Sequence, residues 1–383
     1  MSSRPYAAQR RALSVSEKLL EINWGLVLLI AVIATLGFAM LYSVAGGHFQ
    51  PWALPQMIRF VVGLILLVAI AMVDLRVWMA AAYPLYGVAL VLLFGVEIAG
   101  KMGLGAQRWI ELGPLQLQPS ELMKIALVLA LARYLHGQSV EEVSRPLRLL
   151  IPLGMIAVPV VLVLLEPNLG TATILALDGT SLLFLAGLSW WWIAPTFAAV
   201  VGAVPLAWQH MHDYQKARVL TFLNPSSDAL GAGWNISQAE IAIGSGGFAG
   251  KGFGQGTQSQ LDFLPEKHTD FIYTSIGEEF GFIGSAGLLL LFALVIGFGI
   301  RIAMASRSQF GRLVAMGLTL NFFFYIMINA AMVMGLMPVV GIPMPLISYG
   351  GTAMLTVMVG FGLLMSVHVH RQVEIPRHSA GLM

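Results

Sequence analysis

The sequence of 383 residues contains no cysteine, and only 10% of its residues are charged. The absence of cysteine excludes disulfide bonds and thiolate metal sites. Soluble domains carry about 25% charged residues, whereas 58% of this chain is hydrophobic and its mean hydropathy is +0.81. The composition therefore predicts an integral membrane protein. The net charge of +2 says little about acidic partners. We expect membrane lipids, and no nucleic acid, among the partners.

Long apolar runs are abundant, and a membrane-spanning helix needs about 20 apolar residues. Ten runs approach or exceed that length, at residues 22–45, 57–74, 77–99, 119–136, 149–166, 169–187, 191–209, 271–300, 311–337 and 346–368. We therefore predict an all-α integral membrane protein with about ten transmembrane helices. A large outer loop, residues 210–269, is expected between the seventh and the eighth. The first run exceeds the apolar core of a signal peptide, about 7–15 residues, so we expect it to be retained.

The basic residues predict the orientation of these helices. With a cytoplasmic N-terminus, thirteen Lys and Arg residues fall on the cytoplasmic side and eight on the outer side. The positive-inside rule then favours both termini in the cytoplasm. Residues 1–21 are expected to form a basic cytoplasmic tail, residues 22–370 the membrane domain, and residues 371–383 a second cytoplasmic tail.

Polar chemistry is concentrated in one stretch, Gly244–Phe282. Asp270 stands where its glycine-rich part ends and an apolar helix begins, with Lys267 and His268 beside it. Ionisable groups are costly near hydrocarbon, which makes them functional candidates. Alternatively, Asp270 is an N-cap whose carboxylate accepts hydrogen bonds from the free N–H groups of the helix. The two roles are compatible, and both remain open at this point.

The residues on either side of Asp270 extend this candidate site. Glu278 is predicted to lie on the same side of the helix as Asp270, and Glu279 to be structural. Residues Asn235–Ile243 are expected to form a short amphipathic helix. The glycines of Gly244–Gly256 lack the βαβ context of a nucleotide-binding loop. We interpret them as a flexible tract whose backbone approaches a bulky substrate.

A second group of candidates surrounds the start of the fourth predicted span. Arg108 and Trp109 lie in an expected outer loop, residues 100–118, and Glu121 and Lys124 follow it. A spacing of three puts Glu121 and Lys124 on one helical face. They are either a pair that neutralises itself or part of a site in which Arg108 binds phosphate oxygens and Trp109 packs against a sugar or lipid.

The segment Gly341–Thr352, which includes Ser348, interrupts the apolar sequence with proline and glycine before the last span. Irregular backbone at membrane depth is tolerated only where protein covers it or it lines a cavity. We therefore expect this segment to line the same outer cavity as Asp270. Two further acids, Glu166 and Asp178, lie in apolar runs, each with a partner that the sequence does not identify.

The chain resembles the SEDS family of cell-wall polymerases, the RodA/FtsW/SpoVE family, over essentially its whole length. The resemblance rests on three motifs, GAQRW…QPSELMK, LPEKHTDFIYTSIGEEFG and PMPLISYGGT. The short N-terminal tail and the wording GTQSQLDFLPE resemble the RodA-like elongation branch more than the FtsW-like division branch. At Asn168 the family commonly has Asp, so a role that needs that carboxylate is in doubt.

This resemblance implies a peptidoglycan glycosyltransferase that polymerises lipid II on the outer face of the cytoplasmic (inner) membrane. It implies a class B penicillin-binding protein transpeptidase as the partner and Asp270 as the essential catalytic residue. The remaining expected site residues, all assigned to substrate binding, are Arg108, Trp109, Glu121, Lys124, Lys267, His268, Glu278 and Ser348.

The residues and the resemblance together predict an inverting transfer. The 4-hydroxyl of one lipid II attacks C1 of the sugar on the growing chain, Asp270 removes its proton as general base, and undecaprenyl pyrophosphate leaves. Arg108, Lys124 and Lys267 are candidates to stabilise the leaving group. A divalent cation, Mg²⁺ or Mn²⁺, would be held mainly through the pyrophosphate, because few carboxylates lie on the outer side.

Two other functions compete with this prediction. Membrane charges and broken helices also suit a transporter that flips lipid II across the bilayer. However, a flippase needs polar groups along the whole path, whereas the candidates cluster at the outer rim. A scaffold that only anchors the transpeptidase would leave Asp270 without a purpose.

Overall fold

The computed structural model describes residues 14–99, 101–103, 106–112, 115–192, 194, 198, 202, 208–209, 213–224, 232–261, 263–264 and 266–376. In chain order its elements are α1 (Val15–Glu21), α2 (Trp24–Val44), α3 (Ala53–Ala71), α4 (Leu75–Ala99), β1 (Lys101–Gly103), β2 (Ala106–Leu112), β3 (Leu115–Leu117), α5 (Pro119–His136), α6 (Val140–Val143), α7 (Pro146–Leu165), α8 (Leu169–Leu185), α10 (Asp213–Leu223), α11 (Ala232–Gly246), α12 (Thr257–Gln260), α13 (Ile272–Ala305), α14 (Gln309–Val333) and α15 (Gly351–Val369).

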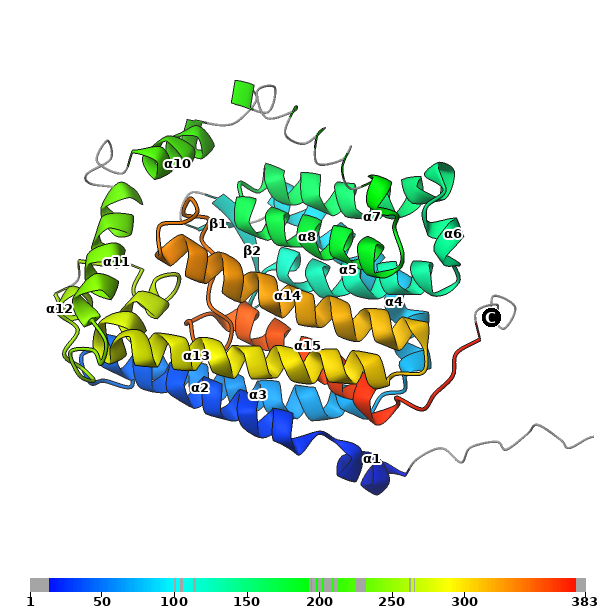
Figure 1. Cartoon of the computed structure of the whole chain (residues 1–383), viewed down its shortest axis with the longest axis horizontal. Helices are drawn as coiled ribbons and strands as arrows, with labels where there is room; N and C mark the ends of the chain where they lie inside the picture. Colours follow the sequence, from blue (N-terminus) through cyan, green and yellow to red (C-terminus); the bar gives the residue numbers. More distant parts are fainter. Residues whose placement is uncertain are drawn as a thin grey trace, which may run out of the picture.

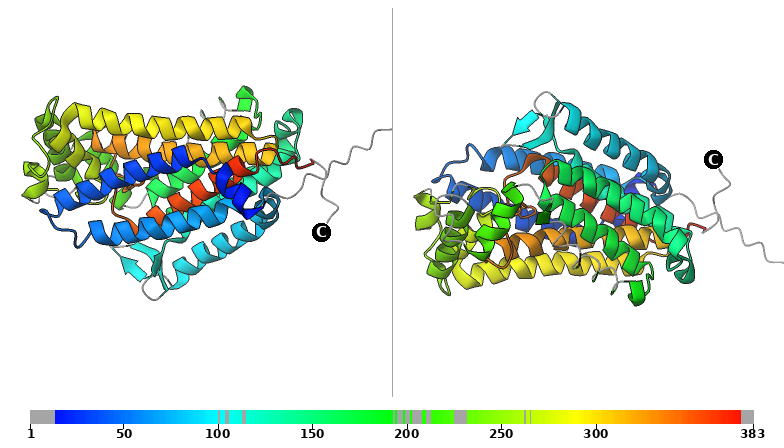
Figure 2. Two further views of the ribbon diagram at one scale, coloured as in Figure 1. Left: turned by 90° about the horizontal axis from the view of Figure 1, so that it is seen from below. Right: turned by 90° about the horizontal axis from the view of Figure 1, so that it is seen from above.

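The long helices lie side by side in one bundle (Figures 1 and 2). Within the described residues, seven of them are long and apolar enough to cross a membrane, namely α2, α3, α4, α7, α13, α14 and α15. Two more match predicted spans: α8 is a shorter apolar helix of 17 residues, and α5 has 18 residues with charged side chains in its first and last turns. The prediction of a helical integral membrane protein is confirmed. The predicted span 191–209 lies largely outside the described residues.

The centre of the bundle is formed by α5 and α14, whose residues are buried along most of each helix. α5 packs against α4, α8 and α14, and α15 packs against α3. In contrast, α3, α4 and α7 expose large apolar side chains on one side, as expected for helices that face lipid. Charged residues on α5 therefore lie inside the protein.

The prediction of a loop at residues 100–118 is wrong in part, because this segment contains three short antiparallel strands in the order β1-β2-β3. Lys101 pairs with Trp109, and Ile110 pairs with Leu117. β1 and β3, with three residues each, are too short for alternating polarity to predict them. The hairpin carries Trp109 toward the start of α5.

The segment before α13 is more ordered than a long loop. The predicted helix Asn235–Ile243 is confirmed as the longer α11, whereas α10 and α12 were not predicted. α11 and α12 lie at the end of the bundle where α13 begins (Figure 1). α1, α6 and the C-terminal end of α15 lie at the opposite end, where Arg371 forms an ion pair with Glu21 at 2.7 Å. Both described ends of the chain are therefore on the same side of the bundle.

Candidate active site

Asp270 lies in the turn that leads into α13, and its side chain is partly exposed. The N-cap of α13 is Phe271, without a side-chain cap, so the alternative that placed Asp270 at the cap is wrong by one residue. The carboxylate faces the backbone of Gly341, because a Cβ added there would lie 3.4 Å from Asp270 Oδ2. Gly341 has a φ of +70°, a conformation that glycine adopts without steric cost. Asp270 and the irregular segment before α15 therefore meet, and that the two line one outer cavity stays a prediction.

Three hydrogen bonds hold the turn that carries Asp270. Ser348 Oγ donates to the carbonyl of Thr269 at 2.6 Å, and the amide of Tyr349 donates to the carbonyl of His268 at 2.8 Å. Asn329 Nδ2 donates to the carbonyl of Asp270 at 2.8 Å. Each donor comes from an element remote in sequence, so tertiary structure fixes the Asp270 backbone in place.

Ser348 was predicted to contact substrate, but its hydroxyl is engaged on both sides. It is 4% exposed, and besides donating to Thr269 it accepts from the amide of Met344 at 2.7 Å. Lys267 is similarly buried, and its ammonium donates to the carbonyl of Ser259 at 2.6 Å. These two side chains therefore shape the turn, and their burial does not fit direct binding of substrate.

His268, two residues before Asp270, lies between two aromatic side chains. Its ring stacks on Trp52 with centroids 4.4 Å apart and planes at 12°, and it lies 6.0 Å from the ring of Tyr349. Burial holds the pKa of His268 below its usual range, because desolvation disfavours the imidazolium. His268 is thus partly exposed beside Asp270, with one face of its ring covered by Trp52.

Glu121 and Lys124 form the predicted pair, with Lys124 Nζ 2.6 Å from Glu121 Oε1. Tyr325 closes the pair by donating its hydroxyl to both carboxylate oxygens, at 2.9 and 2.8 Å. The Lys124 ammonium also lies 4.2 Å from the centroid of the Tyr325 ring. The exposed fractions of Glu121 and Lys124 are 4% and 1%. In this conformation the pair neutralises itself inside the bundle, and contact with a pyrophosphate would require the bundle to open.

A stripe of polar residues on α14 connects this pair to Asp270. Asn321, Tyr325 and Asn329 follow one another at intervals of four, so they share one helical face. Asn321 Nδ2 donates to Asp178 at 2.5 Å, which identifies the partner of Asp178 that the sequence left open. Sequence reasoning missed all three α14 residues, although their spacing in an apolar run was a usable signal.

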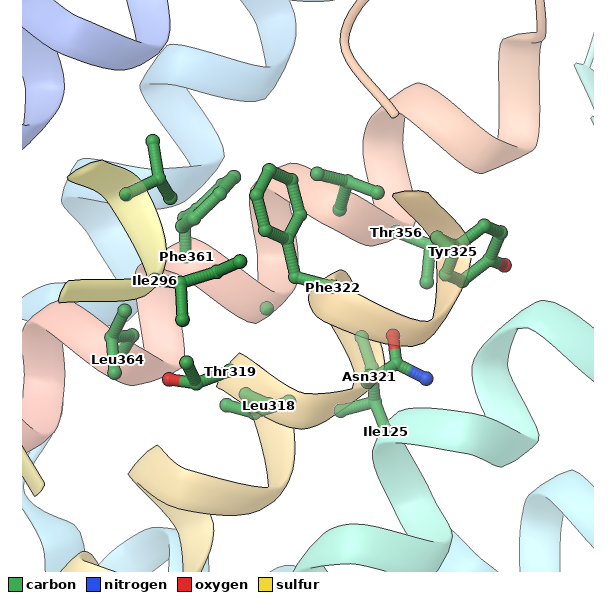
Figure 3. Close-up of a pocket in the computed structure, with 13 residues that line it drawn as sticks. Ile125, Ile296, Leu318, Thr319, Asn321, Phe322, Tyr325, Thr356, Phe361 and Leu364 are labelled. Carbon is green, nitrogen blue, oxygen red and sulfur yellow. The ribbon is translucent and has the colours of Figure 1, made fainter. Parts of the chain in front are cut away.

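The cavity beside this stripe is too small for substrate. It lies among α5, α13, α14 and α15, with Asn321 and Tyr325 on its border (Figure 3). Its volume of about 30 Å³ holds one or two water molecules. A saccharide or an isoprenoid chain therefore does not fit there, and the partly exposed region around Asp270 remains the candidate site.

Glu278 and Glu279 hold the glycine-rich loop against α13. The Glu278 carboxylate accepts from Lys251 Nζ at 2.7 Å, from Thr257 at 3.0 Å and from the amide of Gln258 at 3.0 Å. Glu278 is fully buried, which does not fit its predicted contact with substrate. Glu279 accepts from Ser43 at 2.5 Å and is structural, as predicted.

The glycines of this loop approach protein rather than an open site, which corrects their interpretation as a flexible tract. α13 is broken at Gly281, with φ 63° and ψ −154°, and carbonyls near the break accept from the amides of Lys251 and Gly252. A Cβ added to Gly250 would lie 2.1 Å from the carbonyl oxygen of Glu279. Glycine is therefore required there for contact between two backbones.

Trp109 is partly buried on β2, and the side chain of Arg108 lies outside the described residues. The hairpin contacts the first turn of α15, where Thr352 Oγ1 donates to the carbonyl of Gln116 at 2.5 Å. The segment just before this turn is the one that meets Asp270. Among described residues, no group of three or more His, Asp or Glu side chains could hold a metal ion. The expected divalent cation, held mainly through a pyrophosphate, therefore stays a prediction.

Comparison with known proteins gives consistent matches. The family model FTSW_RODA_SPOVE, described as "Cell cycle protein", matches residues 18–373. The peptidoglycan glycosyltransferase MrdB of Escherichia coli (strain K12) is 45% identical over 316 residues, which cover 82% of this chain and 85% of that protein. The probable peptidoglycan glycosyltransferase FtsW of Trichlorobacter lovleyi is 36% identical over 365 residues, covering 91% and 94%.

Two solved structures share the fold. One chain comes from the study "Structural coordination of polymerization and crosslinking by a peptidoglycan synthase complex". It is 34% identical, with a TM-score of 0.80, over 91% of this chain and 98% of that one. The crystal structure of the Thermus thermophilus rod shape determining protein RodA is 32% identical, with a TM-score of 0.70, over 91% and 97%.

Proposed function

The chain belongs to the FtsW/RodA/SpoVE (SEDS) family, on its RodA-like side, and is a peptidoglycan glycosyltransferase of cell elongation; from this premise we propose that Asp270 is its general base. The substrate is lipid II. The 4-hydroxyl of one sugar attacks C1 of the sugar on the growing chain, and Asp270 accepts the hydroxyl proton. The bond from C1 to undecaprenyl pyrophosphate breaks, and the configuration at C1 inverts.

The observation that carries this proposal is the way Asp270 is held. Its backbone carbonyl is bound by Asn329, and the residues before it are bound by Ser348 and Tyr349. Asp270 is partly exposed, and its carboxylate lies beside the backbone of Gly341. A base that is fixed before substrate arrives needs little reorganisation in the transition state. This combination of a fixed backbone and a partly exposed residue supports catalysis at Asp270.

The leaving pyrophosphate needs positive charge. Lys124 is buried against Glu121 and Lys267 against α12, so we assign this role to Arg108 and to a divalent cation brought with the substrate. Such a cation would supply electrostatic stabilisation of the leaving group. Trp109 and the ring of His268 would pack against the sugar or the lipid, since both side chains are partly exposed.

We further propose that the protein lies in the cytoplasmic membrane with both termini in the cytoplasm and Asp270 at the outer face. The distribution of basic residues favours this orientation. A class B penicillin-binding protein transpeptidase is the proposed partner. One similar chain belongs to a peptidoglycan synthase complex that coordinates polymerisation and crosslinking, which supports such a pairing.

A lipid II flippase is the second candidate, because the polar stripe of α14 enters the bundle from the Asp270 end. Against this function, the stripe is occupied by Asp178, Glu121 and Lys124, and the cavity beside it is only about 30 Å³. A transport path would have to be wider.

Purified protein in detergent with lipid II separates the functions. A polymerase makes glycan strands although there is no membrane to cross, whereas a flippase or a scaffold makes none. We expect strands from the wild-type protein together with its transpeptidase partner. The absence of strands, combined with lipid II movement in vesicles, would favour the flippase.

A further inference from the structure

A second cleft lies at the end of the bundle opposite Asp270. It is bordered by the C-terminal ends of α5 and α8, by the turn between α13 and α14, and by residues 374–376. Its volume is about 660 Å³, far larger than the cavity beside α14. Neither Asp270 nor any other residue proposed for catalysis lines it, so the glycosyl transfer does not explain this cleft.

The cleft has a basic side and an apolar side. Arg307 and Arg312 contribute two guanidinium groups, and Glu374 contributes one carboxylate. Glu374 lies 3.4 Å from Arg307, with side chains 74% and 49% exposed, so this pair is weak and readily exchanged. Leu185 and Val140, which are 42% and 61% exposed, line the apolar side. An anion attached to an apolar chain matches both sides.

The position of the cleft at the end of the transmembrane helices indicates that lipid headgroups lie beside it. It lies where α13 ends at Ala305 and α14 begins at Gln309. Trp190 and Trp191, close to the end of α8, are 69% and 86% exposed, and exposed indoles are enriched at membrane–water interfaces. Basic pockets between transmembrane helices on the cytoplasmic side commonly bind anionic lipid headgroups.

We propose that this cleft binds the phosphate of an anionic phospholipid, held by Arg307 and Arg312, with the start of an acyl chain against Leu185 and Val140. The lipid displaces Glu374 from Arg307, so Glu374 competes with the phosphate. Because the cleft joins α5, α8 and α14, bound lipid ties together the same helices that carry the Glu121–Lys124 pair and Asp178.

The test uses the full chain in neutral detergent. Phosphatidylglycerol or phosphatidylcholine with identical acyl chains is added, and the bound lipid is counted by native mass spectrometry. We expect selective binding of phosphatidylglycerol. Since a basic residue near an anionic surface contributes about 1 kcal/mol, Arg307→Gln and Arg312→Gln should each weaken binding about fivefold. Glu374→Gln should strengthen it.

Two controls keep the test specific. Arg301→Gln removes an exposed arginine of α13 that does not line the cleft, and it should bind like the wild type. Arg307→Lys keeps the charge and should retain most binding, even if a glutamine variant folds poorly. Equal binding of both lipids, unchanged binding in both glutamine variants, or equal occupancy by free glycerol phosphate would overturn the proposal.

Discussion

Two glutamate–lysine pairs of nearly equal length, one buried and one partly exposed, have different roles in this molecule. Lys124 lies 2.6 Å from Glu121, and Lys251 lies 2.7 Å from Glu278. The first pair joins residues three apart on one helix, with side chains 1% and 5% exposed. The second joins a loop to α13, and its lysine is 27% exposed. The first pair makes charge tolerable inside the bundle, whereas the second docks a loop near the turn that carries Asp270.

The two pairs also differ in the number of additional hydrogen-bond donors that contact each glutamate. Lys124 has the Tyr325 ring and Glu121 around its ammonium, and Glu121 depends on Lys124 and Tyr325 for its hydrogen bonds. Glu278 also accepts from Thr257 and from the amide of Gln258. Loss of the lysine should therefore lower the free energy of unfolding much more in the first pair than in the second.

The largest expected effect is on stability. Lys124→Met leaves Glu121 as a buried charge without its lysine and should destabilise the protein by about 3–5 kcal/mol. Lys251→Met should cost only about 1–2 kcal/mol, because Glu278 keeps its other donors. The apparent Tm of each variant in detergent measures this difference. The double variant Glu121→Gln/Lys124→Met should recover much of the loss. A lower Tm for Lys251→Met than for Lys124→Met would reverse the assignment of roles.

A second prediction concerns the docked loop itself. Gly250 and Gly254 both have positive φ, +82° and +72°, so alanine is strained at either position by about 1–2 kcal/mol. A Cβ at Gly250 also meets the Glu279 carbonyl at 2.1 Å, whereas one at Gly254 has nothing within 4 Å. Gly250→Ala should therefore cost about 1–3 kcal/mol more than Gly254→Ala, and only Gly250→Ala should make the loop accessible to limited proteolysis. Equal behaviour of the two variants would mean that the loop is not held by this contact.

The smallest effect is on pH dependence. Burial keeps the pKa of His268 below its usual range. The stability that its neutral form contributes is thus present above about pH 6.5 and is lost as the pH falls through the lower folded pKa. His268→Gln should remove this part of the dependence of Tm on pH between pH 5 and 8. Lys251→Met should weaken this pH dependence, because Lys251 and the α12 residue Thr257 both bind Glu278, and Ser259 of α12 accepts from Lys267, the neighbour of His268. Gly254→Ala should leave the pH dependence unchanged. A His268→Gln profile identical to that of the wild type would contradict this account.

The local pair was predictable and the remote pair was not. Glu121 and Lys124 are three residues apart, so helical periodicity alone places them together. Lys251 and Glu278 meet only because α13 breaks at Gly281 and the loop folds back onto it. The same limit applies to Ser348, whose sequence position predicted the right neighbourhood but not the hydrogen bond to Thr269 that occupies its hydroxyl. Helices and their apolar lengths follow from local sequence, whereas which polar atoms are already satisfied depends on tertiary contacts.

The central claim is that the carboxylate of Asp270 removes the proton from the attacking hydroxyl, and the rate of glycan strand formation by purified Asp270→Asn with lipid II tests it most directly. Asparagine has nearly the same shape but cannot accept that proton, so we expect no strands, while the apparent Tm and binding of the transpeptidase partner remain those of the wild type. Polymerisation at the wild-type rate by this variant would contradict the account.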